Sequence, residues 1–368
     1  MSAASPRCWV VAGGGTGGHV TPALALAERI AARGDRVVIL GGRRGLETRL
    51  VPRAGFELVA LPARPLMGRG ALGALLALPA IGAACASAWR TLGRLRAAIV
   101  ISVGGYAAVP AVVAATARGI PVALVEPNAV PGRANRATAR RARVAFAGFE
   151  ATARALAPVA RRVVVTGIPL RRDLVAAFAG GTARRVPSPP HRVLVFGGSQ
   201  GAHQINTAMT EVARGLGAGR IELFHQTGEA DREAVAAAYA AAGIPAEVVA
   251  FEPDMPRRYR WADLAVCRSG ALTVAELAMA GLPALLVPFP HAADDHQRAN
   301  AKALAEAGAA RVLESRPLEA AELARTLSEL LEKPDELGAM GRAAARLARP
   351  DAAERIVEEC AALLTAGR

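Results

Sequence analysis

Residues 263–297 combine residue types that could bind an anionic, hydroxyl-rich ligand. The stretch reads as an apolar strand, a short loop at 268–270, a helix over 271–280 and a second apolar strand. Small residues before a helix start leave backbone N–H groups and the positive end of the helix dipole available to an anion. Glu276 lies about one and a half turns into that helix. Its carboxylate could therefore accept hydrogen bonds from hydroxyl groups of the same ligand.

Polar side chains follow the second of these strands, in residues 288–297. They include His291, Asp294, Asp295, His296 and Gln297. Ligands of open α/β sheets bind outside the carboxyl ends of the strands, so this loop is a second part of the predicted site. Phosphate, ribose and polyhydroxyl groups are the ligands that such a site would suit. The alternative interpretation is an ordinary strand–helix–strand unit with a capped helix and a solvated loop.

A glycine-rich loop, GGGTGGH, follows the first apolar run of the chain and precedes a helix. Gly13, Gly15 and Gly18 satisfy the G-x-G-x-x-G pattern of dinucleotide-binding proteins. The next strand is followed by arginines instead of the acidic residue that would bind an NAD ribose, so only an NADP enzyme would fit. His19 ends the loop, where its side chain could lie near a bound ligand or merely cap or pack.

A second glycine loop, GGSQG at 197–201, has two interpretations. It fits the nucleophile elbow of serine hydrolases, with Ser199 as nucleophile and Asp254 with His291 or His296 as its partners. It also fits an anion-binding helix start, and anion binding would explain both glycine loops by one physical cause. The hydrolase interpretation leaves the first loop unexplained. Because the chain has no Asp-x-Asp pair to hold a divalent cation against a diphosphate, we expect no metal.

Strands and helices alternate along most of the chain, which is typical of a doubly wound parallel α/β fold. The linker-like segment 180–191 separates two halves, because the order strand, glycine loop, helix occurs at the start of each half. We predict a first domain over 1–166 and a second domain over 167–350. The helical end of the chain, 351–368, is expected to pack back on the first domain.

Composition limits the function classes. The chain has a formal net charge of +14, but aromatic residues make up only 4% of it. That is too few for base-stacking along a basic groove, so we expect no nucleic acid. The four cysteines are far apart and are expected to be buried, reduced thiols.

One segment, residues 71–89, contains no charged residue and is rich in alanine and glycine. A membrane-spanning helix, a buried helix pair and an interfacial apolar face are the three interpretations. Pro79 and the arginines on both sides of the segment argue against spanning. The absence of a signal peptide at the start of the sequence predicts a cytoplasmic protein.

Several long segments resemble one family. In chain order they are GGGTGGH, GGYAAVP, EPNAVPGRANR, GGSQGA, CRSGALTVAEL and AGLPALLVPFPHAADDHQ. Together they are similar to the MurG family, which transfers N-acetylglucosamine (GlcNAc) from UDP-GlcNAc to the 4-hydroxyl of MurNAc in undecaprenyl-diphospho-MurNAc-pentapeptide (lipid I). The resemblance implies a GT-B fold, with two Rossmann-like domains facing a cleft. It also implies peripheral binding to an anionic membrane surface, at the cytoplasmic face of the bacterial inner membrane.

The resemblance also implies roles for individual residues. His19 would be the catalytic base, with Glu126 as an alternative group to share the proton, and Tyr106 and Asn135 would lie on the acceptor side. Within the donor set, Glu276 would bind the ribose and Gln297 the sugar. The full donor set is Thr16, Gly17, Gly18, Asn128, Arg171, Ser199, Glu252, Ala271, Leu272, Thr273, Val274, Ala275, Glu276 and Gln297. No cofactor is implied.

One position departs from the family pattern. Ile168 stands where the family commonly has the asparagine of a Gly-Asn-Pro turn. The departure calls into question a polar contact at the predicted hinge, and it leaves the donor segments unchanged.

Overall fold

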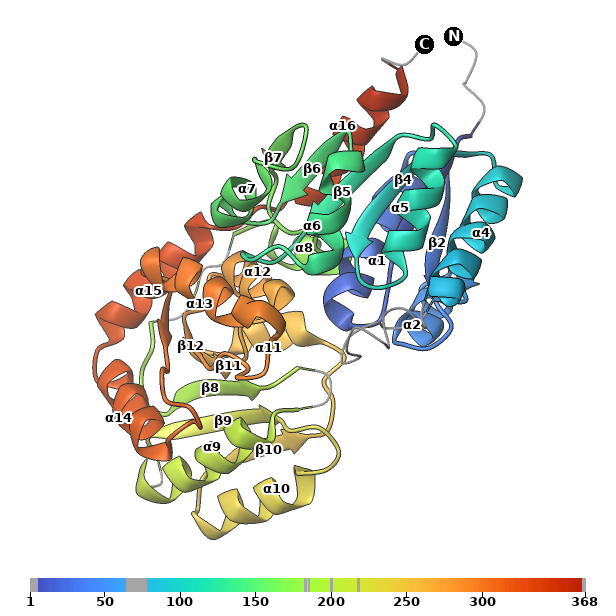
Figure 1. The fold of residues 1–368 in the computed structure, drawn as a ribbon. Coiled ribbons are helices and arrows are strands. Elements are labelled where there is room, and N and C mark those ends of the chain that lie inside the picture. Colours follow the sequence, from blue (N-terminus) through green and yellow to red (C-terminus); the bar gives the residue numbers. More distant parts are fainter. Residues whose placement is uncertain are drawn as a thin grey trace. The chain divides into compact units, whose positions relative to one another are not determined.

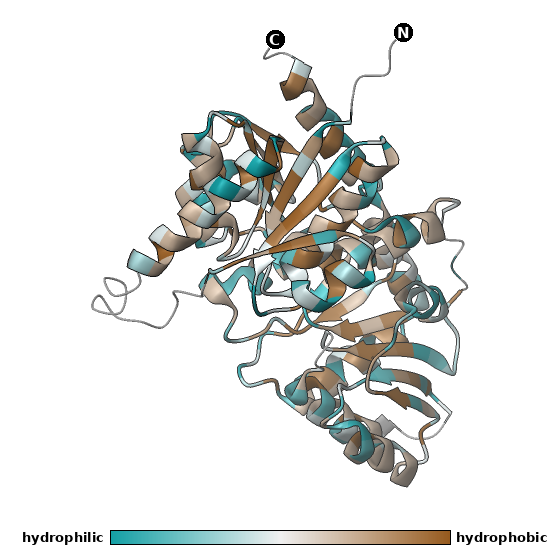
Figure 2. Ribbon diagram, turned by 90° about the vertical axis from the view of Figure 1, so that its right-hand side faces the viewer, coloured by the Kyte–Doolittle hydropathy of each residue, from teal (hydrophilic) through white to brown (hydrophobic). Residues whose placement is uncertain are grey.

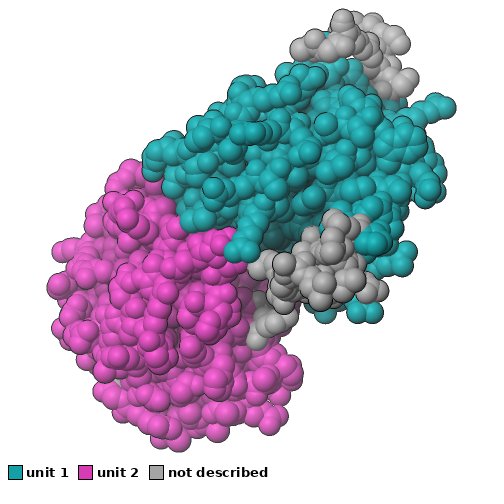
Figure 3. Space-filling model, in the orientation of Figure 1, with its two compact units in different colours: residues 1–173, 349–368 teal, residues 174–348 magenta. Residues whose placement is uncertain are grey.

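The computed structural model describes residues 6–63, 78–181, 184, 186–198, 201–216 and 219–365 (Figure 1). The chain forms two compact units, which Figure 3 colours separately. Unit 1 comprises Met1–Asp173 and Arg349–Arg368, and unit 2 comprises Leu174–Ala348. The first boundary between the units falls after Asp173, whereas the sequence predicted it after residue 166. The segment that follows the last strand of unit 1 stays with that unit, because the Arg172 N–H donates to Glu28 of its first helix.

Unit 1 contains a seven-stranded parallel sheet in the order β3-β2-β1-β4-β5-β6-β7. Its strands are β1 (Cys8–Gly13), β2 (Arg36–Gly42), β3 (Glu57–Leu61), β4 (Ala97–Gly104), β5 (Val122–Glu126), β6 (Val144–Ala147) and β7 (Val163–Val165). Its helices are α1 (Gly17–Ala32), α2 (Glu47–Arg53), α4 (Leu78–Arg94), α5 (Ala108–Ala117), α6 (Arg133–Thr138), α7 (Glu150–Leu156) and α16 (Ala352–Thr365), with a short 3-10 helix at Ala139–Arg141. Every residue of β1 is buried, as expected for a strand covered on both faces.

Unit 2 contains a six-stranded parallel sheet in the order β10-β9-β8-β11-β12-β13. Its strands are β8 (His191–Phe196), β9 (Ile221–Gln226), β10 (Ala246–Val249), β11 (Leu264–Cys267), β12 (Ala284–Leu286) and β13 (Ala310–Val312). Its helices are α9 (His203–Leu216), α10 (Arg232–Ala241), α11 (Met255–Trp261), α12 (Ala271–Ala280), α13 (His296–Glu306), α14 (Ala320–Leu331) and α15 (Pro334–Arg346), with a 3-10 turn at Ala293–Asp295. Helix α8 (Arg172–Phe178) carries the chain from unit 1 into unit 2.

The strand order reverses direction once in each sheet. The chain proceeds from β1 through β2 to β3 on one side and then returns to β4 on the other, and β8 to β11 repeat this path. Ligands bind at such switch points, outside the carboxyl ends of the strands. Both glycine loops lie there, directly after β1 and β8. The prediction of two doubly wound parallel-sheet domains is confirmed.

The last helix completes the core of unit 1. Ile356, Val357 and Cys360 of α16 are buried in the same cluster as Leu26 and Ile30 of α1. Figure 2 shows hydrophobic residues concentrated on the strands. The chain therefore returns to its first unit after the second is complete.

Helix α4 contains the described part of the uncharged segment. Ala84, Ala88 and Leu92 are buried at helical spacing, whereas the Trp89 side chain is 46% exposed. Residues 71–77 lie outside the described residues. Across the described ranges, no helix has both the length and the hydropathy needed to cross a bilayer.

Candidate functional site

The site in unit 1 forms where the loops after β1 and β4 meet α6. A Cβ atom added to Gly104 would lie 3.2 Å from both His19 Cδ2 and Asn135 Nδ2, and 3.3 Å from His19 Nε2. The glycine at this position therefore allows the imidazole and the amide to approach the same point. His19 and Asn135, predicted separately as base and acceptor contact, are close together.

The orientation of His19 is set within the first turn of α1. Thr16 Oγ1 lies 3.0 Å from His19 Nδ1, and the two residues are separated by three positions. Helix α1 begins at Gly17, so Thr16, Gly17 and Gly18 form the start of the helix that carries the histidine. This hydrogen bond directs Nε2 to the Gly104 side, where a proton could be exchanged with a ligand.

A buried carboxylate, Glu126, organises the loop after β5. Its oxygens accept hydrogen bonds from the backbone N–H of Asn128 and Gly132 and from the side-chain amides of Asn128 and Asn135, at 2.8–3.2 Å. Burial raises the pKa of Glu126, and these four N–H groups oppose the rise. The arrangement favours a role in holding the two asparagines over the alternative of sharing a proton with His19.

Asn135 has one polar atom that the described residues leave unsatisfied. Its amide nitrogen donates to Glu126 and to the carbonyl of Val125, while its buried Oδ1 has no hydrogen-bond partner in the described part of the chain. A buried acceptor without a partner is costly. A hydroxyl group of a ligand is the kind of donor that would satisfy it.

Glu47 is a residue of this site that the sequence reasoning missed. Its fully buried carboxylate accepts the backbone N–H groups of Gly15, at 2.8 Å, and Gly42, at 2.9 Å. The N–H of Gly15 is therefore used within the protein. The expectation that anion binding explains both glycine loops in the same way is wrong for this donor. The only signal in the sequence was the density of glycines at 41–45, next to Glu47.

Tyr106 lies over the same group of loops. Its hydroxyl donates to the carbonyl of Arg44 at 2.6 Å, and a side chain on Gly42 would overlap that hydroxyl. Its ring is also close to Gly15, since an added Cβ there would lie 3.2 Å from Tyr106 Cε1. The predicted acceptor contact thus shares its surroundings with the first glycine loop.

In unit 2, a chain of hydrogen bonds holds the second glycine loop. Gln226 donates to the carbonyl of Gly198 at 2.8 Å and accepts the backbone N–H of Glu252 at 3.0 Å. The Glu252 carboxylate accepts from Asp254 N–H and from Arg258 Nε. The Glu252 carboxylate, predicted as a donor contact, is thus engaged within the protein. Ser199 lies outside the described residues.

Helix α12 begins at Ala271, as the sequence predicted, with Gly270 before it. Glu276 Oε2 accepts a hydrogen bond of 2.6 Å from the hydroxyl of Tyr259. Burial raises the pKa of Tyr259 well above its usual value, so the phenol stays protonated and donates. Val274 is buried in the core, whereas Leu272, Thr273, Ala275 and Glu276 are partly exposed.

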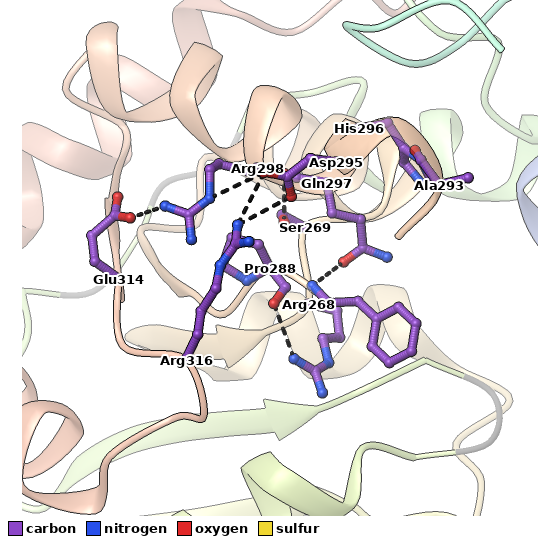
Figure 4. Close-up of polar contacts among 11 residues, drawn as sticks. Arg268, Ser269, Pro288, Ala293, Asp295, His296, Gln297, Arg298, Glu314 and Arg316 are labelled. Carbon is purple, nitrogen blue, oxygen red and sulfur yellow. Dashed lines mark hydrogen bonds and ion pairs between the residues drawn. The ribbon is translucent and has the colours of Figure 1, made fainter. Parts of the chain in front are cut away.

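The loop after β12 is fixed by several polar contacts (Figure 4). Gln297 Oε1 accepts the N–H of Phe289 at 2.9 Å, and the Gln297 carbonyl accepts the Ser269 hydroxyl at 2.8 Å. The Asp295 carboxylate accepts two contacts from Arg316, at 3.1 and 3.0 Å. These contacts leave the amide NH₂ of Gln297 as the part of its side chain that could donate to a ligand.

Two family models match the chain. The N-terminal domain of glycosyltransferase family 28 matches residues 9–147, and its C-terminal domain matches residues 192–356. A relative from Anaeromyxobacter dehalogenans, named UDP-N-acetylglucosamine--N-acetylmuramyl-(pentapeptide) pyrophosphoryl-undecaprenol N-acetylglucosamine transferase, is 44% identical over 96% of this chain and 92% of its own length. A relative of the same name from Geobacter sulfurreducens is 41% identical over 96% of this chain and 98% of its own length. The crystal structure of Acinetobacter baumannii MurG superposes with a TM-score of 0.78 at 34% identity, and the match covers 96% of this chain and 98% of that one.

The chain belongs to the MurG family. It is therefore a glycosyltransferase with the GT-B fold. The structure of a UDP-GlcNAc 2-epimerase from Neisseria meningitidis has a TM-score of 0.65 at 14% identity, which shows a common fold alone. The resemblance seen in the sequence segments is confirmed.

The alternative of a serine hydrolase finds no support in this MurG-family chain. The Asp254 carboxylate accepts the N–H of Arg257 and so caps α11. His296 bonds through Nδ1 to the carbonyl of Ala293, and His291 packs against the ring of Phe289. The nominated acid and histidines are thus engaged in separate local contacts. The comparisons give no support to the NADP-dependent oxidoreductase either.

Two residues of the MurG-family pattern have contacts in unit 1 that the sequence did not indicate. Arg171, predicted to contact the donor, forms ion pairs with Asp173 at 2.9 Å and Glu28 at 3.5 Å, and the Arg172 N–H donates to Glu28. Ile168 is 4% exposed and packs beside Gly148. An apolar contact therefore occupies the position where the family commonly has asparagine.

Across the described ranges, no cluster of His, Cys, Asp or Glu could hold a metal ion.

Proposed function

We propose that this enzyme transfers GlcNAc from UDP-GlcNAc to the 4-hydroxyl of MurNAc in lipid I, with inversion at the anomeric carbon, giving lipid II for peptidoglycan synthesis. The observation that carries the proposal is the identity of 41–44% over 96% of the chain to relatives whose names state this transfer. The clusters at the two switch points supply the residue types that the reaction needs.

His19 is the proposed base. Inverting transfer requires removal of the proton from the attacking hydroxyl, and an imidazole is suited to this near neutral pH. The Thr16 contact to Nδ1 orients the ring, and Nε2 lies on the Gly104 side, near the Asn135 amide. The unsatisfied Asn135 oxygen would accept a hydroxyl of the acceptor sugar, and Tyr106 would contact the acceptor from the neighbouring loop.

The donor is proposed to bind to unit 2. The start of α9, after the second glycine loop, offers N–H groups and a helix dipole to the departing UDP. Ser199 is proposed to add a contact there. Thr16, Gly17, Gly18, Asn128 and Arg171, all in unit 1, are proposed as further donor contacts on the strength of the family pattern. Glu276, whose carboxylate accepts the Tyr259 hydroxyl, is proposed to accept ribose hydroxyls as well. Gln297 would donate its amide to the sugar.

The test is an assay with UDP-GlcNAc labelled in the sugar and a soluble lipid I analogue, with transfer and hydrolysis followed separately. We expect UDP release to require both substrates and the label to appear in a disaccharide. Hydrolysis without transfer would contradict the proposal, as would stoichiometric labelling of Ser199 by a fluorophosphonate.

We further propose that α4 contributes to peripheral binding at the cytoplasmic face of the inner membrane. The exposed indole of Trp89 lies 3.8 Å below the Arg118 guanidinium, and Arg90, Arg94 and Arg96 are exposed close by. An aromatic ring with basic neighbours suits an anionic lipid surface. The protein should pellet with anionic vesicles at low salt and dissociate at high salt, because salt screens the attraction. Retention after a carbonate wash would contradict this mode of binding.

A further inference from the structure

The side chain of Glu47 is buried, and its carboxylate lies among several glycines. It is the first residue of α2 and is fully buried. Burying a carboxylate is unfavourable unless hydrogen bonds compensate for the lost hydration. Its two oxygens receive the N–H groups of Gly15, which is 32 residues away in sequence, and of Gly42. This carboxylate therefore joins the loop after β1 to the end of β2.

Three glycines provide the space for that carboxylate. A side chain on Gly14 or Gly45 would overlap the Glu47 carboxylate oxygens, and a Cβ on Gly41 would lie 2.7 Å from Glu47 Cγ. Gly15 and Gly45 also adopt positive φ angles, of 94° and 139°. Glycine is the residue that adopts such conformations at little cost. Gly14, Gly41 and Gly45 are thus explained by Glu47 without any ligand.

The same loops carry the groups proposed to act on the acceptor. Gly15 precedes Thr16, which bonds to His19, and it lies against the Tyr106 ring. Tyr106 in turn bonds to the carbonyl of Arg44, between Gly42 and Glu47. A Cβ on Gly105 would lie 2.5 Å from the carbonyl oxygen of Gly14. Because these loops are in direct contact, a shift of Gly15 would displace both His19 and Tyr106.

We propose that Glu47 is a positioning residue for the acceptor side of the site: it fixes the first glycine loop and thereby sets the places of His19 and Tyr106. This inference rests on the proposed function. It also explains why the two glycine loops differ, since a carboxylate receives the Gly15 N–H in the first loop and a glutamine side chain holds the Gly198 carbonyl in the second.

The variant that tests this is Glu47→Gln, which keeps the shape of the side chain. A glutamine can accept one of the two N–H groups, but its NH₂ would face the other N–H, so one hydrogen bond is lost. The matched control is Glu57→Gln on β3, because Glu57 is 47% exposed and pairs with Arg36. Glu47→Asp keeps the charge on a shorter side chain, and its kcat/KM should lie between those of Glu47→Gln and the wild type.

Two readouts are measured. We expect Glu47→Gln to lower kcat/KM for a lipid I analogue about 10- to 100-fold at saturating UDP-GlcNAc, with the Kd for UDP within about twofold of wild type. The imidazole NMR resonance of His19, identified by its loss in His19→Ala, should shift in Glu47→Gln and not in Glu57→Gln.

The outcomes separate this inference from the proposed function. Wild-type protein that transfers no sugar would contradict the proposed function, while the His19 resonance would still decide the role of Glu47. An unshifted resonance together with kcat/KM within about twofold of wild type would overturn the inference. Parallel loss of UDP binding and of melting temperature in Glu47→Gln would overturn it as well, because the residue would then only stabilise the fold.

Discussion

At the scale of single residues, two buried carboxylates receive hydrogen bonds from backbone and amide N–H groups near the residues proposed to act on the acceptor. Glu126 and Glu47 are buried carboxylates that each receive such groups: Glu126 from Asn128 and Asn135, and Glu47 from Gly15 and Gly42. His19 lies between these two arrangements, with its Nδ1 on Thr16. The imidazole that we propose as the base is thus oriented by a hydrogen bond within its own helix start.

His19→Ala should lower kcat by about 10²–10⁴, the usual contribution of a positioned base. UDP binding should be unchanged, because the donor is proposed to bind to unit 2. Steady-state kinetics at saturating acceptor and calorimetric titration with UDP would check the two expectations. A variant with wild-type kcat would exclude His19 as the base.

Glu276→Ala should have the opposite effect. Loss of a carboxylate that accepts ribose hydroxyls should weaken UDP binding about 10- to 150-fold, with a smaller change in kcat. Tyr259→Phe should weaken UDP binding less, since it removes only the hydrogen bond that orients the carboxylate. Titration of both variants with UDP measures the effect, and unaltered affinity in Glu276→Ala would show that this carboxylate does not meet the ribose.

His225 should make the stability of unit 2 depend on pH. Its ring bonds to the Tyr239 hydroxyl and to Asn206, and burial lowers its pKa to about 3. The unfolded chain, with an ordinary histidine pKa near 6.5, binds this proton first as the pH falls. The contribution of His225 to the free energy of unfolding is complete above pH about 6.5. It is lost between that pH and pH about 3, at about 1.4 kcal/mol per pH unit.

Urea unfolding at pH 7 and pH 5 would measure this effect. Between pH 7 and pH 5, the free energy of unfolding of the wild type should fall by about 2 kcal/mol more than that of His225→Gln. His291→Gln is the control, because His291 is exposed and lies in another loop of the same unit. Equal losses in the wild type and His225→Gln would contradict the assignment.

At the scale of elements, local sequence predicted much of what the structure shows. The apolar run at 264–267 and the helix from 271 to 280 match β11 and α12 to the residue, because their boundaries depend on neighbouring small and apolar residues. The role of Glu47 could not be predicted in this way. Its partner Gly15 is 32 positions distant, and no motif or periodicity connects them. The contacts of Arg171 with Glu28 are likewise long-range.

Helix α16 should stabilise unit 1 in particular. Ile356 is fully buried against α1, so Ile356→Ala should lower the free energy of unfolding of that unit by about 2–5 kcal/mol. Glu358→Ala, on the exposed side of the same helix, should change it by less than about 0.5 kcal/mol. Urea unfolding with UDP titration would show whether unit 2 keeps its ligand. Equal stability of the two variants would contradict the packing role of α16.

At the scale of the whole molecule, the division into two units could be anticipated from the repeated order of strand, glycine loop and helix. The position of the boundaries could not, because the Arg171 and Arg172 contacts that extend unit 1 to Asp173 involve Glu28 on α1. Acceptor activation is proposed for unit 1, and the contacts with the nucleoside are proposed for unit 2. We therefore expect His19→Ala to act mainly on transfer and Glu276→Ala mainly on donor binding.

The configuration of the product tests the central claim most directly. UDP-GlcNAc labelled with ¹³C at the anomeric carbon would be incubated with a lipid I analogue, and the product examined by NMR. We expect a β-configured GlcNAc linked to the 4-hydroxyl of MurNAc, formed only when both substrates are present. An α-configured product, a linkage to another hydroxyl, or free GlcNAc alone would contradict inverting transfer by this enzyme.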